Sequence, residues 1–232
     1  KTLGERAGEE YLTGFLVEKT LAMDNVFVIS LIFGYFAIPP ALQHRVLLWG
    51  ILGVIVLRAF IIAAGAAIIS GFSWILYVFA LFLVATGIKM LMAGHSAPDI
   101  SANPVLRLLR RYLRITPALE GERFVVRKPD PATGRVVWWA TPLLVALVMI
   151  EFVDLVFAVD SVPAIFAITD DPFVVYTSNI FAILGLRAMY FALAAMLPRF
   201  RYLKPAMAAV LVFIGGKIFV ADLAGWEKFP AS

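Results

Sequence analysis

The chain has 232 residues, of which 62% are apolar, and its mean hydropathy is +0.92. This composition excludes an ordinary soluble domain and is normal for a bundle of membrane-spanning helices. The absence of Cys excludes a disulfide framework, a thiolate metal site and a thiol redox motif within these residues. The net charge of +4 is small, so the positions of the charged residues carry more information than their sum.

Six segments are long and apolar enough to cross a bilayer, which takes about 20 residues. The predicted spans are Leu12–Ile38, Val46–Ile69, Trp74–Met92, Thr141–Ile168, Phe173–Leu197 and Leu203–Leu223. Proline and glycine residues separate them, as helix-breaking residues do. We therefore predict an all-α membrane protein with six transmembrane helices.

The first and fourth spans share an acidic pattern. The run EKTLAMDNVFVI (Glu18–Ile29) aligns with DLVFAVDSVPAI (Asp154–Ile165). The alignment pairs Glu18 with Asp154, Asp24 with Asp160, and Asn25 with Ser161. Two membrane segments with one pattern indicate an internal duplication.

The repeat continues through the other spans. Leu57-Arg58-Ala59 in the second span recurs as Leu186-Arg187-Ala188 in the fifth, and Gly87-Ile88-Lys89 in the third recurs as Gly216-Lys217 in the sixth. Because the unit has three helices, the second copy is inverted relative to the first, which is a transporter architecture. The predicted parts are an outside N-terminal segment 1–11, repeat one 12–94, a loop 95–140, repeat two 141–224 and a C-terminal segment 225–232.

The central loop has structure of its own. Arg107, Arg110, Arg111 and Arg114 share one face of a helical pattern, and Leu106, Leu109 and Leu113 share another. This predicts a basic amphipathic helix on the inner membrane surface, or equally a solvated helix packed on the rest of the loop. Next, the β-rich runs Arg123–Lys128 and Arg135–Ala140 flank PDPATG, which predicts a hairpin.

The distribution of Lys and Arg predicts the orientation. These residues fill the loops 39–45, 93–140 and 198–202, whereas the loops 70–73 and 169–172 hold none. Positive residues favour the cytoplasmic side. We therefore predict a multi-pass protein of the bacterial inner membrane, with its first residue outside and its central loop in the cytoplasm.

Charged residues within the predicted spans point to a site, since a charge near the bilayer centre costs about 2.5–3.5 kcal/mol. The carboxylates are Glu18, Asp24, Glu151, Asp154 and Asp160, and the cations are Lys19, Arg58, Lys89, Arg187 and Lys217. We predict a metal site formed by Asp24, Asp154 and Asp160 and completed by Glu18, Asn25, Ser161 and Glu151. Such hard oxygen donors suit Mg²⁺, Ca²⁺ and Mn²⁺, and Pro163, which frees the carbonyl of Val159, predicts a helix distortion beside Asp160.

A structural alternative stays open for these carboxylates. Arg58 and Arg187 lie near the middle of their predicted spans and can neutralise acids as buried ion pairs that hold the bundle together. Lys89 and Lys217, as further charge partners, lie nearer the helix ends, where they can extend to the interface. Two central Arg residues can pair with two acids, which leaves other carboxylates to bind a cation or relay protons.

Long stretches of the sequence resemble the TerC/Alx family of integral membrane proteins. The resemblance is carried by FLVEKTLAMDNVFVI (Phe15–Ile29), VLRA (Val56–Ala59), TGIKM (Thr86–Met90), VDLVFAVDSVPAIFAIT (Val153–Thr169), DPFVVYTSNIFAILGLRAMYF (Asp171–Phe191) and FIGGK (Phe213–Lys217). It implies a bacterial inner-membrane protein, in a family where some members export Mn²⁺ and others are tied to tellurium resistance. Members usually carry further membrane helices at both ends, so the resemblance implies that this chain is the central core.

The leading functional hypothesis is an exporter of divalent metal cations, with Mn²⁺ as transported substrate and protons as a possible coupling ion. The alternatives are an oxyanion or tellurite resistance protein that uses the intramembrane Arg residues, and an assembly factor that works through the central loop. An intramembrane aspartyl protease is disfavoured because the Asp contexts are MDN and VDS. We thus predict no enzyme, no tightly bound cofactor and no nucleic-acid partner; the oligomeric state stays open.

Overall fold

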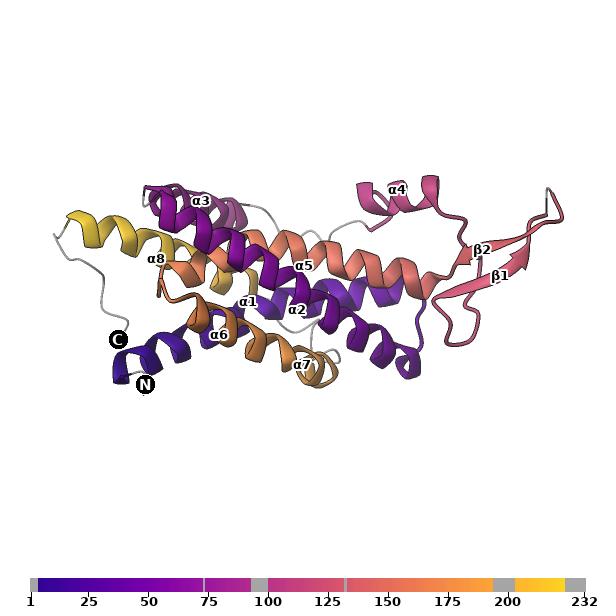
Figure 1. The fold of residues 1–232 in the computed structure, drawn as a ribbon, viewed down its shortest axis with the longest axis horizontal. Helices are drawn as coiled ribbons and strands as arrows, with labels where there is room; N and C mark the ends of the chain where they lie inside the picture. Colours follow the sequence, from indigo (N-terminus) through magenta and orange to yellow (C-terminus); the bar gives the residue numbers. More distant parts are fainter. Residues whose placement is uncertain (1–3, 73, 93–99, 132, 194–202, 224–232) are drawn as a thin grey trace.

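The computed structural model describes residues 4–72, 74–92, 100–131, 133–193 and 203–223. Most of them lie in long helices that run roughly along one direction, with a β-hairpin projecting from one end (Figure 1). The elements are α1 (Glu5–Tyr35), α2 (Pro40–Gly71), α3 (Ile75–Met92), α4 (Pro104–Tyr112), β1 (Val125–Pro129), β2 (Val136–Ala140), α5 (Pro142–Phe166), α6 (Pro172–Leu184), α7 (Leu186–Leu193) and α8 (Leu203–Leu223).

Proline sets the start of four helices. α2, α4, α5 and α6 each have Pro in the first turn, where its missing N–H removes no helical hydrogen bond. Asn103 and Asp171 cap α4 and α6, since their side chains accept hydrogen bonds from the backbone N–H of Val105 and Phe173. The sequence thus fixes where these helices begin.

Four helical stretches in the described part are long and apolar enough to cross a membrane: Pro40–Gly71, Ile75–Met92, Pro142–Phe166 and Pro172–Leu193. α8 holds a shorter apolar stretch, Pro205–Ala221. α1 has 31 residues but carries the acidic motif of the first predicted span. The protein is therefore membrane-embedded and mostly helical, and the helices lie where the six spans were predicted.

One local prediction was wrong. α5 continues as a helix from Pro142 to Phe166 with Pro163 inside it, so no unwinding occurs beside Asp160. The predicted fifth span is present as the helical stretch Pro172–Leu193, in which the single residue Gly185 separates α6 from α7. Its last residues, 194–197, lie outside the described residues.

The main helix contacts join the two halves of the chain. α1 packs chiefly on α6, α2 on α5, and α3 on α8. The α3–α8 contact is very close, because a Cβ on Gly87 would lie 2.8 Å from the carbonyl oxygen of Ala208 and one on Gly215 would lie 2.6 Å from that of Ala80. Small residues that let helix backbones approach are the usual basis of helix association in membranes.

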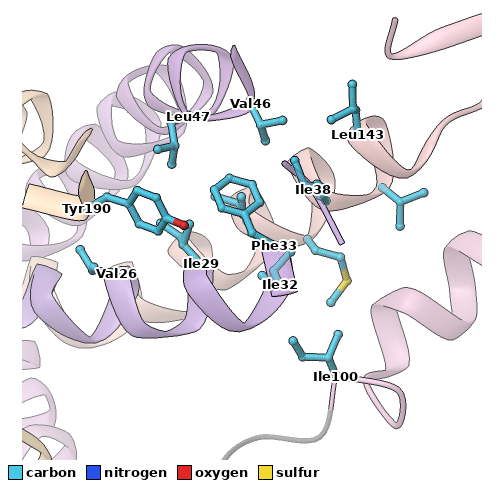
Figure 2. Packing of buried hydrophobic residues seen from close by; sticks show 14 of the residues in the cluster. Val26, Ile29, Ile32, Phe33, Ile38, Val46, Leu47, Ile100, Leu143 and Tyr190 are labelled. Carbon is cyan, nitrogen blue, oxygen red and sulfur yellow. The ribbon is translucent and has the colours of Figure 1, made fainter. Parts of the chain in front are cut away.

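The largest apolar core lies toward the hairpin end of the bundle. Figure 2 shows side chains of α1, among them Val26 and Phe33, packed with Leu47 of α2 and Leu143 of α5. Phe33 meets the ring of Tyr190 edge-on at 5.5 Å between centroids, a favoured aromatic geometry. This core joins α1, α2, α5 and α7 into one unit.

The predicted amphipathic helix and hairpin are both present. β1 and β2 pair antiparallel, with Val125 opposite Ala140 and Pro129 opposite Val136. α4 docks on the main core through Leu106, which is buried, so its apolar side packs on the bundle. The helix therefore lies against the membrane helices rather than on the loop alone.

Candidate functional site

A fully buried guanidinium lies at the centre of the polar residues. Arg58 of α2 has 1% of its surface exposed. Its Nη1 donates to Oε1 of Glu18 on α1 at 2.6 Å, while Nε and Nη2 donate to the two carboxylate oxygens of Asp154 on α5 at 3.2 and 3.1 Å. Arg58 therefore bridges two carboxylates that the sequence repeat had paired with each other.

Neutral polar side chains complete the surroundings of Arg58. Its Nη1 also donates to Oγ of Ser161 at 2.9 Å and to Oδ1 of Asn179 at 2.8 Å. Asn25 donates to Asp154 at 3.0 Å, and Asn179 donates to Glu18 at 3.4 Å. We call Glu18, Asn25, Arg58, Asp154, Ser161 and Asn179 the Arg58 cluster; it draws on α1, α2, α5 and α6.

A small pocket opens beside the Arg58 cluster. Besides members of the cluster, Asp24 and Asp160 line it, and the hydroxyl of Thr86 hydrogen-bonds to Asp160. The space open to water is about 30 Å³, enough for a water molecule or a dehydrated metal ion. Both copies of the acidic motif therefore contribute their second acidic residue to one cavity.

The opposite wall of the pocket comes from the α3–α8 pair. Met90 of α3, together with Met207 and Leu211 of α8, lines this side. The thioethers of the two Met residues are soft donors that face a wall of hard oxygen donors. The pocket thus lies at the seam between the α3–α8 pair and the other helices.

Acidic side chains gather at this seam. Glu18 and Asp154 of the cluster form ion pairs with Arg58, while Asp24 and Asp160 line the pocket beside it. Carboxylates in an apolar surrounding favour binding of a cation or a proton.

Glu151 lies apart from the pocket. Both of its carboxylate oxygens are buried without a hydrogen-bond partner among the described residues. The carboxylate packs on the backbone of α2, where a Cβ on Gly53 would lie 2.4 Å from its Oε1. Glycine at this position is therefore what admits the carboxylate to the α2–α5 interface.

The other predicted charge partners lie away from the cluster. Arg187, expected to match Arg58, instead contacts the imidazole of His44 in the first turns of α2. Lys89 is exposed, and Lys217 is half-buried and interacts electrostatically with Glu10. Near Arg187, Lys19 of α1 donates to the carbonyl of Ala182 in the last turn of α6 at 2.9 Å.

Sequence reasoning missed part of the site. Asn179, Thr86, Met90 and Met207 were not predicted to take part, although they contact the cluster or line the pocket. Asn179 had a detectable signal, because an amide inside an apolar span needs a partner. Among the described residues, no three His, Cys, Asp or Glu side chains form a ready metal-binding group, so the predicted ligands do not all converge in this conformation.

Comparison with known proteins agrees with this picture. The model of the "Integral membrane protein TerC family" matches residues 3–231. Among curated relatives, Alx of Salmonella typhi, named as a candidate membrane-bound redox modulator, is 54% identical over 91% of this chain and 64% of its own length. An uncharacterized membrane protein of Rickettsia felis is 50% identical over 94% of this chain and 70% of its own length.

A further relative, Alx of Escherichia coli K12, is 52% identical over 91% of this chain and 64% of its own length. The chain thus spans about two thirds of the length of these curated relatives. No solved structure gives a significant match.

Proposed function

Because this chain belongs to the TerC family of integral membrane proteins, we propose that it exports divalent metal cations from the cytoplasm, with Mn²⁺ as the first candidate. The observation that carries the proposal is the pocket beside Arg58, whose lining gathers Glu18, Asp24 and Asp160 from both acidic motifs inside apolar helices.

In this proposal Asp24 and Asp160 are the first ligands of the transported ion, since both line the pocket beside the Arg58 cluster. Arg58 acts as a tethered cation that neutralises Glu18 and Asp154. When a metal ion enters, it competes with the guanidinium for these two acids. Glu18, Asn25 and Ser161 then supply further oxygen ligands.

The pocket's composition supports Mn²⁺ over Mg²⁺ or Ca²⁺. Carboxylate, amide and hydroxyl oxygens suit all three ions, whereas a thioether ligand favours a transition metal over the two harder ions. Met90 and Met207 place such sulfurs on the opposite wall. We assign selectivity to these two side chains.

The packing also indicates which parts move. The two sequence halves cannot rock apart as separate bodies, because the chief partner of each of α1, α2 and α3 comes from the other half. The α3–α8 pair is the natural moving unit, since it is tightly joined through Gly87 and Gly215 and borders the pocket. We propose that this pair moves against α1, α2, α5 and α6.

Glu151 is our candidate for the exchanged proton. Its carboxylate has no hydrogen-bond partner in the described structure, and a charged form left so would be costly in an apolar interface. Asp154, three residues along α5, is on the same face of the helix. Whether Glu151 holds a proton would therefore depend on the charge of the Arg58 cluster next to it.

The finer architecture belongs to the same proposal. Six spans in two inverted repeats, with the central loop in the cytoplasm of a bacterial inner membrane, agree with the helix positions and with the Lys and Arg distribution. The paired contacts α1–α6 and α2–α5 are those that a two-fold relation between the halves requires.

The test is Mn²⁺ uptake by inside-out membrane vesicles that contain the full-length protein. Asp160→Asn removes one pocket carboxylate while keeping its size, and we expect uptake to fall at least about tenfold, the effect expected for a charged ligand bond of about 1.4 kcal/mol or more. Glu9→Gln, which removes an exposed acid of α1, is the matched control and should transport normally. Mg²⁺ and Ca²⁺ should compete poorly.

Equal uptake by the Asp160→Asn protein and the Glu9→Gln control would contradict the site. Uptake absent from the parent protein as well would contradict Mn²⁺ export itself. The oxyanion alternative receives no support from the geometry, because an anion at Arg58 would face the carboxylates of Glu18 and Asp154. Thiol redox chemistry cannot come from these residues, which include no Cys.

A further inference from the structure

A larger hollow lies at the hairpin end of the bundle, and its lining residues fall outside the two acidic motifs. It has a volume of about 580 Å³ and lies between the end of α1, helix α4 and the start of α5. Tyr35, Arg110 and Leu113 line it, together with Thr116 and Pro142. The Arg110 guanidinium donates to the hydroxyl of Tyr35 at 3.1 Å, so a positive group and an aromatic hydroxyl are held together at its wall.

The charge around this hollow is not neutralised by the protein. Glu120, Glu122 and Asp130 are the acids of the described segment 100–131, and they form ion pairs with Lys128, Arg45 and Arg114. Arg107, Arg110 and Arg111 form none of the ion pairs in the described structure, and all three are exposed. Three adjacent cations on one short helix thus have capacity for an external anion.

Apolar side chains surround the same cations. Leu108 is 55% exposed, Tyr112 72% and Trp138 61%. A neighbouring hollow of about 510 Å³, which shares Leu113 with the first, includes Tyr112, Trp138 and Leu144 in its lining. Exposed aromatic and Leu side chains beside Arg residues are the pattern of a surface at the membrane–water boundary.

The position of α4 fits that boundary. Leu106 is buried against the core at the ends of α1 and α5, and Figure 1 shows α4 beside the first turns of α5, next to the hairpin. α5 is apolar enough to span a membrane from Pro142 onward. The hollow therefore lies where a spanning helix leaves the hydrocarbon, at the level of lipid headgroups.

We propose that this hollow binds the headgroup of an anionic phospholipid, with Arg110 and Tyr35 holding the phosphate and with its glycerol and acyl chains against Leu113 and the aromatic side chains beside it. Arg presents two N–H groups in a fork that matches phosphate oxygens, and Tyr35 adds a hydroxyl donor. A zwitterionic lipid offers the same phosphate but brings a cation close to the Arg residues, so it binds less well. The proposal does not depend on which ion the protein transports.

The test uses the full-length protein in an uncharged detergent. Short-chain phosphatidylglycerol is titrated while the thermal unfolding midpoint is recorded, because a ligand of the folded state raises that midpoint. Phosphatidylglycerol should raise it in the parent protein, whereas phosphatidylcholine at equal concentration should have much less effect. Inorganic phosphate should have none.

Arg110→Gln should raise the half-saturating phosphatidylglycerol concentration by about fivefold, the effect of losing one surface cation near a lipid headgroup. Arg135→Gln, which removes an exposed cation of the same loop, is the matched control and should bind as the parent does. Arg110→Lys keeps the charge but loses the fork, so it should lie between them and gives a second test if Arg110→Gln unfolds.

Three results would overturn the proposal. Equal shifts with phosphatidylglycerol and phosphatidylcholine would show no headgroup recognition, and equal binding by the Arg110 and Arg135 variants would place recognition elsewhere. An equal shift with inorganic phosphate would identify a site for the free anion instead of a lipid.

Discussion

At the scale of single residues, Arg58 is the side chain on which the polar interior depends. It is fully buried and contacts Glu18, Asp154, Ser161 and Asn179. Removing one partner of a buried ion pair is far more costly than replacing the whole group, because the remaining charge is left without compensation. Removal of Arg58 would leave two such carboxylates, Glu18 and Asp154, without their partner.

This gives a stability prediction for which the chain also offers a matched control position. Arg58→Met should lower the free energy of unfolding by about 3–5 kcal/mol, measured by thermal or denaturant unfolding in detergent. Arg187→Met is the matched control, because the sequence repeat pairs the two residues but Arg187 contacts His44 and takes part in none of the ion pairs of the described residues. Its cost should stay within about 1 kcal/mol. Similar costs for both variants would contradict the assigned role of Arg58.

Sequence reasoning predicted the acids better than their partners. The repeated motif identified residues that do meet, since Glu18, Asp24, Asn25, Asp160 and Ser161 all line one pocket. The motif could not tell Arg58 from Arg187, because both stand in Leu-Arg-Ala. What separates them is tertiary: Arg58 meets Glu18 and Asp154 on other helices, whereas Arg187 contacts His44, and local spacing does not specify such long-range contacts.

At the scale of elements, glycine distribution decides how α3 and α8 pair. Gly87 of α3 and Gly216 of α8 both stand beside the Lys residues of the repeated motif, but their surroundings differ. A Cβ on Gly87 would lie 2.7 Å from the side chain of Val212 and 2.8 Å from the Ala208 carbonyl, whereas nothing lies within 4 Å of one on Gly216. Backbone atoms cannot move aside as the end of a side chain can, so the first contact cannot be relieved locally.

We therefore expect opposite outcomes for one substitution at two glycines of the paired helices. Gly87→Ala should destabilise the protein by about 1–3 kcal/mol through overpacking and should impair transport if the α3–α8 pair is the moving unit. Gly216→Ala should be neutral or slightly stabilising, since Ala is the better helix former. Unfolding midpoints of the two purified variants, recorded together, check the prediction; tolerance of Gly87→Ala would contradict the close approach.

Helices were predictable as elements because apolar runs bounded by Pro and Gly define them almost completely. The hairpin and α4 also followed from local patterns, namely alternating β-rich runs around a turn and Leu spacing against Arg spacing. The continuity of α5 through Pro163 did not follow, because a Pro inside a membrane helix can be accommodated by its neighbours. Ala158, Val162 and Ile165 around it are all tightly buried.

At the scale of the whole molecule, the two halves are interlocked instead of lying side by side. α1 of the first half packs on α6 of the second, and α2 on α5, while α3 and α8 pair with each other. The order of features in the sequence indicated two related halves, but it could not show that each supplies half of every main contact. Long-range helix pairing depends on surfaces that no single segment reveals.

The orientation of this molecule in the membrane can be tested by labelling single introduced Cys residues. Because the chain has no Cys of its own, each introduced Cys is its only thiol. Thr133 lies exposed in the hairpin, and Gly71 lies exposed at the end of α2, far from the hairpin end of the bundle. α2 has 32 residues, which corresponds to about 48 Å at 1.5 Å per residue and exceeds the hydrocarbon thickness. The two sites should therefore lie on opposite sides of the membrane.

A membrane-impermeant thiol reagent applied to spheroplasts should label Gly71→Cys and spare Thr133→Cys, because the proposed orientation places the loop 93–140, with its eight Lys and Arg residues, in the cytoplasm. Inside-out vesicles should give the reverse pattern, which makes each variant the control for the other. Labelling of both from one side would mean that α2 does not cross the membrane. A swapped pattern would place the hairpin outside, and the anionic-lipid site would then face the outer leaflet.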